Sequence, residues 1–177
     1  MSNITNDRNE KVAKVIKYDM VIRGAYLAHV IPIEELVKDI ISYHFCSDEE
    51  KHKQFISLIL NGRDYTFASG IEILEKILDI HYHDLTQRYP KLIRDLNKIR
   101  QFRNSLAHSM LDTSDGFLAK NYTDRIRLIS YDDRGQTNYR DITRSEIDER
   151  LEDCIDIHFA LVDIRVEVRD RVLTKAE

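Results

Sequence analysis

Hydrophobic residues recur every three or four positions along most of the chain, the spacing that places them on one face of an α-helix. Pro32 and Pro90 are expected to open two helices, because the missing N–H of proline costs nothing at a first helical position. Residues 47–50 and 143–146 have the form of capping boxes and are expected to open two more. Together these signals predict helices over about 7–29, 32–45, 47–60, 66–84, 90–111 and 145–173.

The helical period breaks once, between about 117 and 142. Arg125-Ile126-Arg127-Leu128 alternates polar with apolar residues, and Asp132 to Gln136 supplies turn residues, so we expect a β-hairpin there. No linker or repeat divides the chain, which predicts one domain over 1–177. The fold class is therefore predicted to be all-α, a bundle of five or six helices with a small antiparallel β-hairpin before the long C-terminal helix. The residues expected to be buried on that last helix are Ile147, Leu151, Ile155, His158, Val162 and Val166.

The predicted helix over 90–111 has one unusual position on its buried face. Its apolar seam is expected to comprise Leu92, Leu96, Ile99, Leu106 and Met110. The seam position between Ile99 and Leu106 is assigned to Arg103, and a guanidinium is costly there unless it is paired or open to a cleft. His108 follows five residues later, and its ordinary pKa suits proton transfer near neutrality. Such breaks in a pattern tend to be functional, so Arg103 and His108 are candidate site residues.

The segment Arg103-Asn104-Ser105-Leu106-Ala107-His108 resembles the Arg-X(4–6)-His motif of the HEPN superfamily, which favours a polar residue after the arginine. The resemblance of layout covers about residues 10–173. It implies an all-helical fold, usually dimeric, and in many members a metal-independent ribonuclease of toxin, anti-phage or RNA-processing systems. One departure is Met110, which stands where toxins paired with minimal nucleotidyltransferase antitoxins often carry tyrosine. Modification by such a partner is therefore not expected here.

The resemblance also implies roles for the motif residues. RNA would supply its own 2′-hydroxyl as nucleophile, so neither a metal nor a cofactor is expected. His108 would move the proton, and Arg103 would hold the phosphate with two hydrogen bonds and stabilise its developing charge. Asn104 is expected to orient His108, because residues four apart share a helix face. The products would carry 2′,3′-cyclic phosphate and 5′-hydroxyl ends.

Arg103 and His108 are five residues apart, which is about 140° around an ideal helix. They would converge better across a two-fold axis than within one helix, so we expect a homodimer with one composite site. The alternative is a non-catalytic HEPN-like module for dimerisation or for binding RNA or protein. In that case Arg103, paired with an acid such as Glu72 or Glu75, and His108 would belong to a structural hydrogen-bond network.

Charge is unevenly distributed along a chain whose net charge is −4. Residues 88–103 contain six Lys or Arg residues and a single acid, Asp95. The candidate RNA-binding residues are Lys91, Arg94, Lys98 and Arg100. Such a run is either a solvated helix face or a track that guides phosphate toward the motif.

The remaining residues favour a protein of the reducing cytoplasm. Cys46 and Cys154 are too isolated to suggest a disulfide framework. No signal peptide or bilayer-spanning apolar run is visible, so no membrane association is expected. His81 and His83 are weak metal candidates because residues two apart point to different sides of a helix. The expected partners are an RNA substrate, a second copy of the chain and a cognate neutralising or effector protein.

Overall fold

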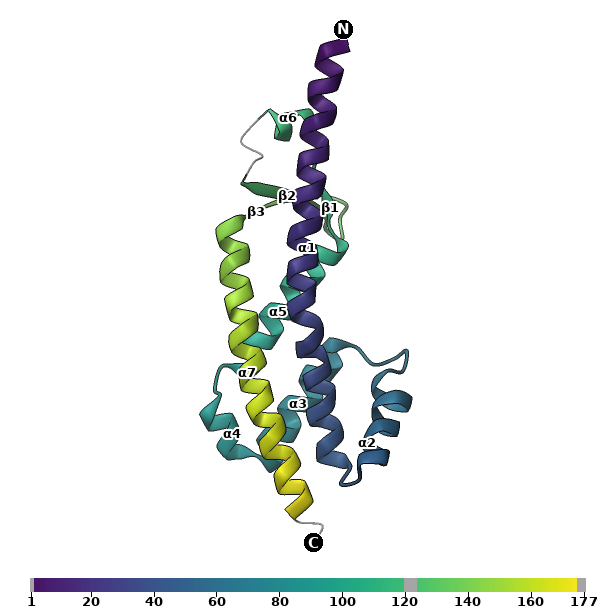
Figure 1. Ribbon diagram of the computed structural model, residues 1–177, viewed down its shortest axis with the longest axis vertical. Coiled ribbons are helices and arrows are strands. Elements are labelled where there is room, and N and C mark those ends of the chain that lie inside the picture. Colours follow the sequence, from purple (N-terminus) through teal and green to yellow (C-terminus); the bar gives the residue numbers. More distant parts are fainter. Residues whose placement is uncertain (1, 120–123, 175–177) are drawn as a thin grey trace. The chain divides into compact units, whose positions relative to one another are not determined.

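The computed structural model describes residues 2–119 and 124–174 and is mostly helical, at 76%. Three strands form one antiparallel sheet in the order β1-β2-β3, ahead of the final long helix. The strands are β1 (Met110–Leu111), β2 (Arg125–Tyr131) and β3 (Thr137–Thr143). The described helices are α1 (Ser2–Phe45), α2 (Glu49–Phe55), α3 (Phe67–His81), α4 (His83–Arg88), α5 (Leu92–His108), α6 (Asp115–Leu118) and α7 (Arg144–Thr174), shown in Figure 1. The mostly helical fold with a hairpin is confirmed, although these seven helices exceed the five or six predicted.

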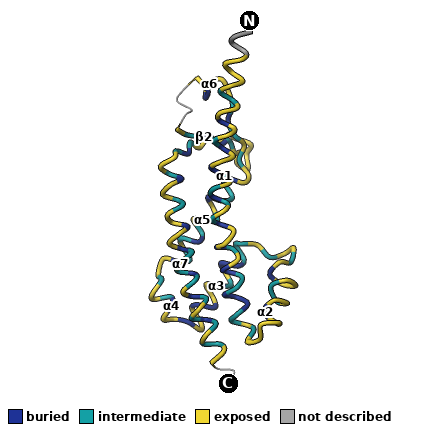
Figure 2. The backbone as a smooth tube through the Cα atoms, in the orientation of Figure 1, coloured by how far each residue is buried: buried dark blue, intermediate teal, exposed yellow. Residues whose placement is uncertain are grey.

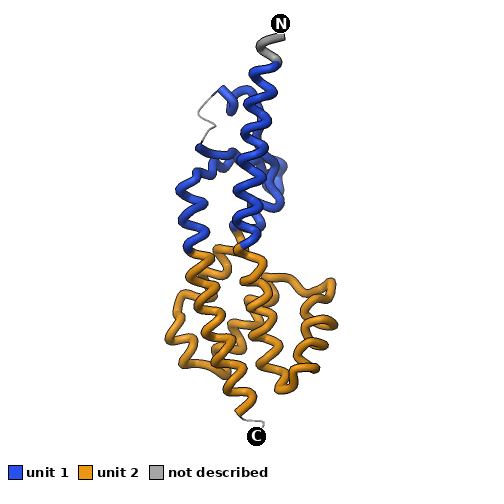
Figure 3. Tube along the Cα trace, viewed as in Figure 1, with its two compact units in different colours: residues 1–28, 102–152 blue, residues 29–101, 153–177 orange. Residues whose placement is uncertain are grey.

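The chain divides into two compact units (Figure 3). Unit 1 comprises Met1–Ala28 and Phe102–Glu152, and unit 2 comprises His29–Gln101 and Asp153–Glu177. The helices α1, α5 and α7 each contribute residues to both units. Each unit has buried apolar residues of its own, and organisation as one domain stays a prediction.

Helix α1 continues through the position where two helices were predicted to meet. Pro32 lies inside it, so the prediction of a new helix opening there is wrong. A proline in a helix interior removes one backbone hydrogen bond and usually ends or bends the helix. Here the apolar positions on both sides are buried, with Val30 1% and Ile33 0% exposed. Burial of this face outweighs the local preference of proline.

The start of α2 differs from the prediction by one residue. Asp48, rather than Ser47, caps the helix, and its carboxylate accepts hydrogen bonds from the backbone N–H groups of Glu50 and Lys51. A π-helical turn over Ile56–Leu60 follows α2 directly. It ends at Asn61, as predicted.

The predicted helix over 66–84 begins where expected and ends early. Thr66 and Ser69 form a reciprocal capping box at the start of α3. Tyr82 leaves the helical conformation and separates α3 from α4. Its side chain is buried, and its hydroxyl lies 3.1 Å from Nδ1 of His44. This tertiary contact accounts for a break that periodicity did not indicate.

The β-hairpin of unit 1 is confirmed. The side chain of Asp132 accepts hydrogen bonds from the N–H groups of Arg134 and Gln136, and Gly135 takes a positive φ of 74°. A glycine tolerates this conformation without steric cost. The earlier part of the predicted first strand is different, because 115–118 is helical and 120–123 lies outside the described residues.

The third strand, β1, comes from residues assigned by the sequence to a helix. Met110 pairs with Ile129 and Leu111 with Leu128. The prediction of a helix to Leu111 with Met110 buried is therefore wrong, since α5 ends at His108 and Met110 is 55% exposed. Pairing with β2 satisfies backbone groups that a further helical turn would have used.

Helix α7 buries a different face from the one predicted. Thr143 caps it as expected, its hydroxyl accepting from the Glu146 N–H at 3.2 Å. Of the predicted stripe, Ile147 is buried, Leu151, His158 and Val162 are half-buried, and Ile155 and Val166 are exposed. The buried residues are Ile147, Cys154, Ile157, Leu161, Ile164 and Val168. Apolar residues occur both on the buried side of α7 and on its exposed side, so their spacing alone fits either choice.

Two further properties bear on the surroundings of the protein. Within 2–119 and 124–174, no helix combines the length and apolar character needed to cross a bilayer. Both cysteines are free thiols; Cys46 is half-buried, and Cys154 is 1% exposed on the inner face of α7.

Candidate functional site

The buried seam of α5 differs from the prediction at two positions: Met110, which lies beyond the helix in β1, and the position assigned to Arg103. Leu92, Leu96, Ile99 and Leu106 are all buried. Phe102, at 2% exposed, occupies the position between Ile99 and Leu106, whereas Arg103 is half-buried beside it. A helix face accepts a step of three and then four residues, as through Phe102, as well as a step of four and then three, as through Arg103. The spacing alone therefore did not distinguish the two residues. Arg103 therefore borders the core of unit 1 instead of interrupting it.

Phe102 anchors the helix turn that carries Arg103. Its ring meets Tyr26 edge-on, with centroids 4.8 Å apart. The guanidinium groups of Arg140 and Arg150 lie over the same ring, 5.0 and 5.1 Å from its centroid. Both arginines also pair with Glu146. Cation–π contacts of this kind place two more cations beside the predicted motif, and no local sequence pattern indicated either of them.

The side chain of Arg103 is positioned by its neighbour. Its Nη1 donates a hydrogen bond to Oδ1 of Asn104 at 3.1 Å. A guanidinium has five N–H donors in a fixed planar fork, so this bond helps to orient the whole group. Asn104 was predicted to orient His108. Its side-chain oxygen instead accepts the hydrogen bond from Arg103, and a role toward His108 stays a prediction.

His108 is the last residue of α5 and is exposed. The carbonyl of the next residue, Ser109, accepts a hydrogen bond from Nη2 of Arg23 at 3.2 Å. Arg23 is held in turn by both carboxylate oxygens of Asp19, at 2.8 and 2.9 Å. This part-buried ion pair of α1 fixes the backbone that follows His108, while the imidazole faces solvent. A fixed backbone with an accessible imidazole suits proton transfer to a bound substrate.

The sequence also indicates that Asp19 and Arg23 need a tertiary partner. Asp19 and Arg23 are four residues apart on a predicted helix, the spacing of an ion pair on one face. Asp19 is 9% exposed in the structure. A charged pair among apolar residues predicts a tertiary partner, because a buried charge needs compensation.

The candidate RNA-binding residues lie in unit 2, whereas Arg103, Asn104 and His108 lie in unit 1. Lys91, Arg94 and Lys98 are exposed, and Arg100 is half-buried with its Nε donating to Asn97. Asp95 accepts from Arg94 at 3.0 Å and from Lys98 at 2.8 Å. Burial acts to raise the pKa of Asp95, but the hydrogen bonds from these two cations outweigh it, so the pKa is lowered. Asp95 therefore stays ionised at neutral pH and offsets part of the basic run.

Arg88, the first cation of the basic run, is also engaged by acids. It bonds to Asp163 at 3.1 Å and to Glu167 at 3.2 Å. These bonds to Glu167 and Asp163 raise the pKa of Arg88. The net positive charge of the run is thus smaller in the folded chain than its sequence indicates.

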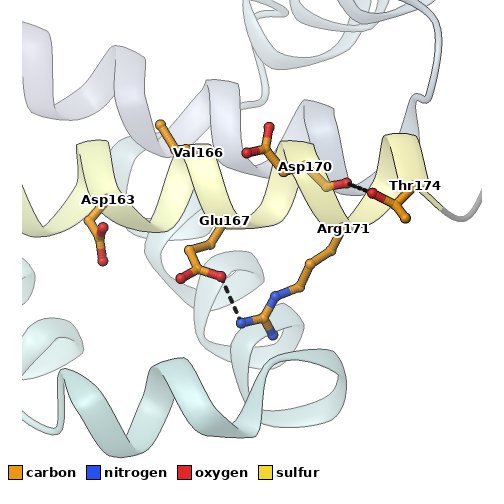
Figure 4. A pocket seen from close by; sticks show the side chains of 6 residues that line it. All are labelled: Asp163, Val166, Glu167, Asp170, Arg171 and Thr174. Carbon is orange, nitrogen blue, oxygen red and sulfur yellow. Dashed lines mark hydrogen bonds and ion pairs between the residues drawn. The ribbon is translucent and has the colours of Figure 1, made fainter.

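A metal site and a ligand-binding hollow are the two other kinds of site to consider. Among the described residues, no group of three or more His, Cys, Asp or Glu side chains is arranged to hold a metal ion. A hollow of about 590 Å³ lies along α7, lined by Asp163, Val166, Glu167, Asp170, Arg171 and Thr174 (Figure 4). Three of these side chains are acidic, and Arg171 is bonded to Glu167 and Asp84. This hollow would repel a phosphate, so it is not part of the candidate RNA site.

Comparison with family models, with curated proteins and with solved structures gives no match.

Proposed function

We propose that the protein is a metal-independent endoribonuclease of HEPN type that acts in the cytoplasm, in a toxin or anti-phage defence role. The observation that carries this proposal is the end of α5, where Arg103 is held by Asn104 and an exposed His108 follows on a backbone tied to Arg23. The arginine offers a phosphate clamp, and the histidine offers a proton-transfer group. The resemblance of 103–108 to the HEPN motif supports the same assignment.

In the proposed reaction the 2′-oxygen of RNA forms a bond to the adjacent phosphorus, and the bond from phosphorus to the 5′-oxygen breaks. The 2′-hydroxyl proton passes to a neutral His108, and the leaving 5′-oxygen takes a proton from a protonated His108 or from water. Arg103 stabilises the negative charge that develops on the phosphoryl oxygens. The products are a 2′,3′-cyclic phosphate and a 5′-hydroxyl.

A homodimer is part of this proposal. One His108 cannot act as base and acid in the same event, whereas two copies supply both groups. The offset of about 140° between Arg103 and His108 on an ideal helix also favours a phosphate held between two chains. A cognate neutralising or effector protein would control such an enzyme.

A second candidate function is a non-catalytic module for dimerisation or for binding RNA or protein. The Asn104–Arg103 bond and the Arg23–Ser109 bond favour it, because both fit a structural network at the junction of α5 and β1. This candidate predicts no cleavage by the unmodified protein. It also predicts a loss of thermal stability in Arg103→Ala.

A cleavage assay on a labelled RNA in EDTA tests the proposal. His108→Ala should lower the cleavage rate by about 10² to 10⁴, the usual contribution of general acid–base catalysis. His83→Ala is the matched control, because His83 is also exposed but lies in unit 2. An all-2′-deoxy oligonucleotide should not be cleaved, since it lacks the nucleophile. Unchanged cleavage by His108→Ala, in a variant with an unchanged thermal melt, would contradict the catalytic role.

A further inference from the structure

The two faces of the three-stranded sheet in unit 1 differ in burial. Ile126, Leu128 and Ile142 are at most 1% exposed and belong to its buried face. Side chains alternate between the two faces along a strand, so Ile129 of β2 projects from the opposite face. On the neighbouring strand, β3 is exposed over residues 137–140 (Figure 2). The opposite face of the sheet is therefore open beside Ile129.

Strand pairing places Met110, Ile129 and Tyr139 in one row across this open face. Met110 pairs with Ile129, and Ile129 pairs with Tyr139. Residues paired directly in an antiparallel sheet project from the same face, with their Cβ atoms about 5 Å apart. Met110 is 55% exposed and Tyr139 62%, and Tyr131, a diagonal neighbour of Tyr139 on this face, is 61% exposed. We call Met110, Ile129, Tyr131 and Tyr139 the platform.

The ring of Tyr139 is held in place by a neighbouring ion pair. The guanidinium carbon of Arg127 lies 5.9 Å from the centre of this ring. The same guanidinium donates to both carboxylate oxygens of Asp141, at 2.5 and 2.9 Å. The two charges compensate each other, so the pair orients the ring without adding a net negative charge that would repel RNA. The chemistry that the platform offers a ligand is therefore aromatic rather than ionic.

The platform begins directly after the candidate catalytic histidine. His108 ends α5, and Met110 opens β1 two residues later. Consecutive Cα atoms are about 3.8 Å apart, so the Cα atoms of these two residues lie within about 7.6 Å of each other. Two strand spacings, about 10 Å together, lead from Met110 to Tyr139. About three stacked nucleotides cover that distance, so the platform lies within reach of an RNA chain whose phosphate is held at His108.

We propose that the platform binds unpaired bases of single-stranded RNA next to the phosphate that is cleaved, with one base stacked on the ring of Tyr139. Every base has a flat π-face, and aromatic side chains on an open antiparallel sheet are a known surface for stacking bases. The four side chains are few for a protein partner, because a typical protein interface takes about 800 Å² from each side. A single base requires little more than one ring.

The position of the bases beside His108 rests on the proposed function, whereas the stacking itself does not. The platform also defines a substrate class. Bases in a duplex are paired and already stacked on one another, so their faces cannot lie on Tyr139. Single-stranded RNA should therefore bind more tightly than a duplex of the same sequence.

Binding of a labelled 2′-O-methyl oligoribonucleotide tests the platform, because this RNA analogue lacks the nucleophile and is not cleaved. Tyr139→Ala should weaken binding about five- to 150-fold, the usual range when one stacking ring is lost. Tyr139→Phe keeps the ring and should bind within about twofold of the unmodified chain. Phe159→Ala is the matched control, because Phe159 is 68% exposed but lies in unit 2. Fluorescence anisotropy measures all four proteins.

A second measurement remains decisive if Tyr139→Ala does not fold. The chain has no tryptophan, so Tyr139→Trp adds a single indole at the proposed contact. Its emission should be quenched when the oligonucleotide binds, and absence of quenching would overturn the inference. Unchanged binding by a folded Tyr139→Ala would also overturn it. A change in the sedimentation of Tyr139→Ala with unchanged RNA binding would show that this face serves a protein partner instead.

None of these measurements requires RNA cleavage. Binding that depends on Tyr139, in a chain that cleaves no RNA, would uphold the platform and remove the proposed catalysis. Cleavage by the unmodified chain, with Tyr139→Ala equally active and equally tightly bound, would uphold the proposed function and overturn the platform.

Discussion

The two ends of α5 carry similar charges in very different surroundings. At its start, Arg94 and Lys98 are exposed and share the carboxylate of Asp95. At its end, Arg103 is half-buried, donates a hydrogen bond to Asn104, and follows a buried phenylalanine whose ring is contacted by Arg140 and Arg150. An exposed pair of ions is worth little and changes easily, whereas a cation next to a core is fixed in position. Under the proposed function, the start of α5 would attract RNA and the end of α5 would hold one phosphate.

The largest expected effect tests whether the end of α5 is anchored by its core. Phe102→Ala should destabilise the protein by about 3 to 5 kcal/mol, the usual cost of emptying a buried aromatic position. Met110→Ala, at a 55% exposed site of the same unit, should change stability by less than about 0.5 kcal/mol. Urea denaturation followed by circular dichroism measures both. Equal, small effects would show that the end of α5 is as loosely held as its start.

A smaller effect is expected from exchanging one cation for another at the two ends. Arg103→Lys should lower cleavage about 10² to 10³, because a point charge does not reproduce the planar fork that stabilises the phosphoryl oxygens. Arg94→Lys should leave the rate within about twofold, since an attracting surface needs only charge. Single-turnover cleavage rates compare the two. A similar cleavage rate for both variants would show that Arg103 binds the phosphate no more specifically than Arg94 attracts the RNA.

The smallest effect concerns the acid that offsets the basic run. Asp95 carries a negative charge at neutral pH and bonds to both cations, so Asp95→Asn should leave the charges of Arg94 and Lys98 uncompensated. We expect RNA to bind about two- to fivefold more tightly, with a steeper dependence on salt. Filter binding at several salt concentrations measures the slope, and Asp79→Asn, an exposed acid of α3, is the control. Unchanged binding would place the RNA elsewhere on the molecule.

The helical fold, the hairpin and most of the α5 seam could be predicted from the sequence because each depends on local periodicity. Three features could not. Pro32 lies inside α1 because tertiary burial outweighs a local preference, and β1 forms because β2 offers its backbone to Met110 and Leu111. Phe102, rather than Arg103, fills the seam because helical spacing admits either residue.

The members of the candidate site stay a prediction from the sequence, and the contacts that support them were not predicted. The motif over 103–108 was visible as a short sequence pattern. The bond from Arg23 to Ser109 and the arginines over Phe102 join residues far apart in the chain. Sequence spacing carries no information on such contacts unless an isolated charged pair, as at Asp19 and Arg23, indicates that a partner is needed.

The two thiols of the protein are expected to react with a thiol reagent at very different rates. Cys46 is half-buried, and Cys154 is 1% exposed on the inner face of α7. A thiol reagent should therefore modify one group quickly and the other only when α7 detaches locally from its core. The slow phase measures the opening rate of α7 without any added label. If the slow modification of Cys154 became slower at higher protein concentration, association between copies of the chain would be hindering the opening of α7.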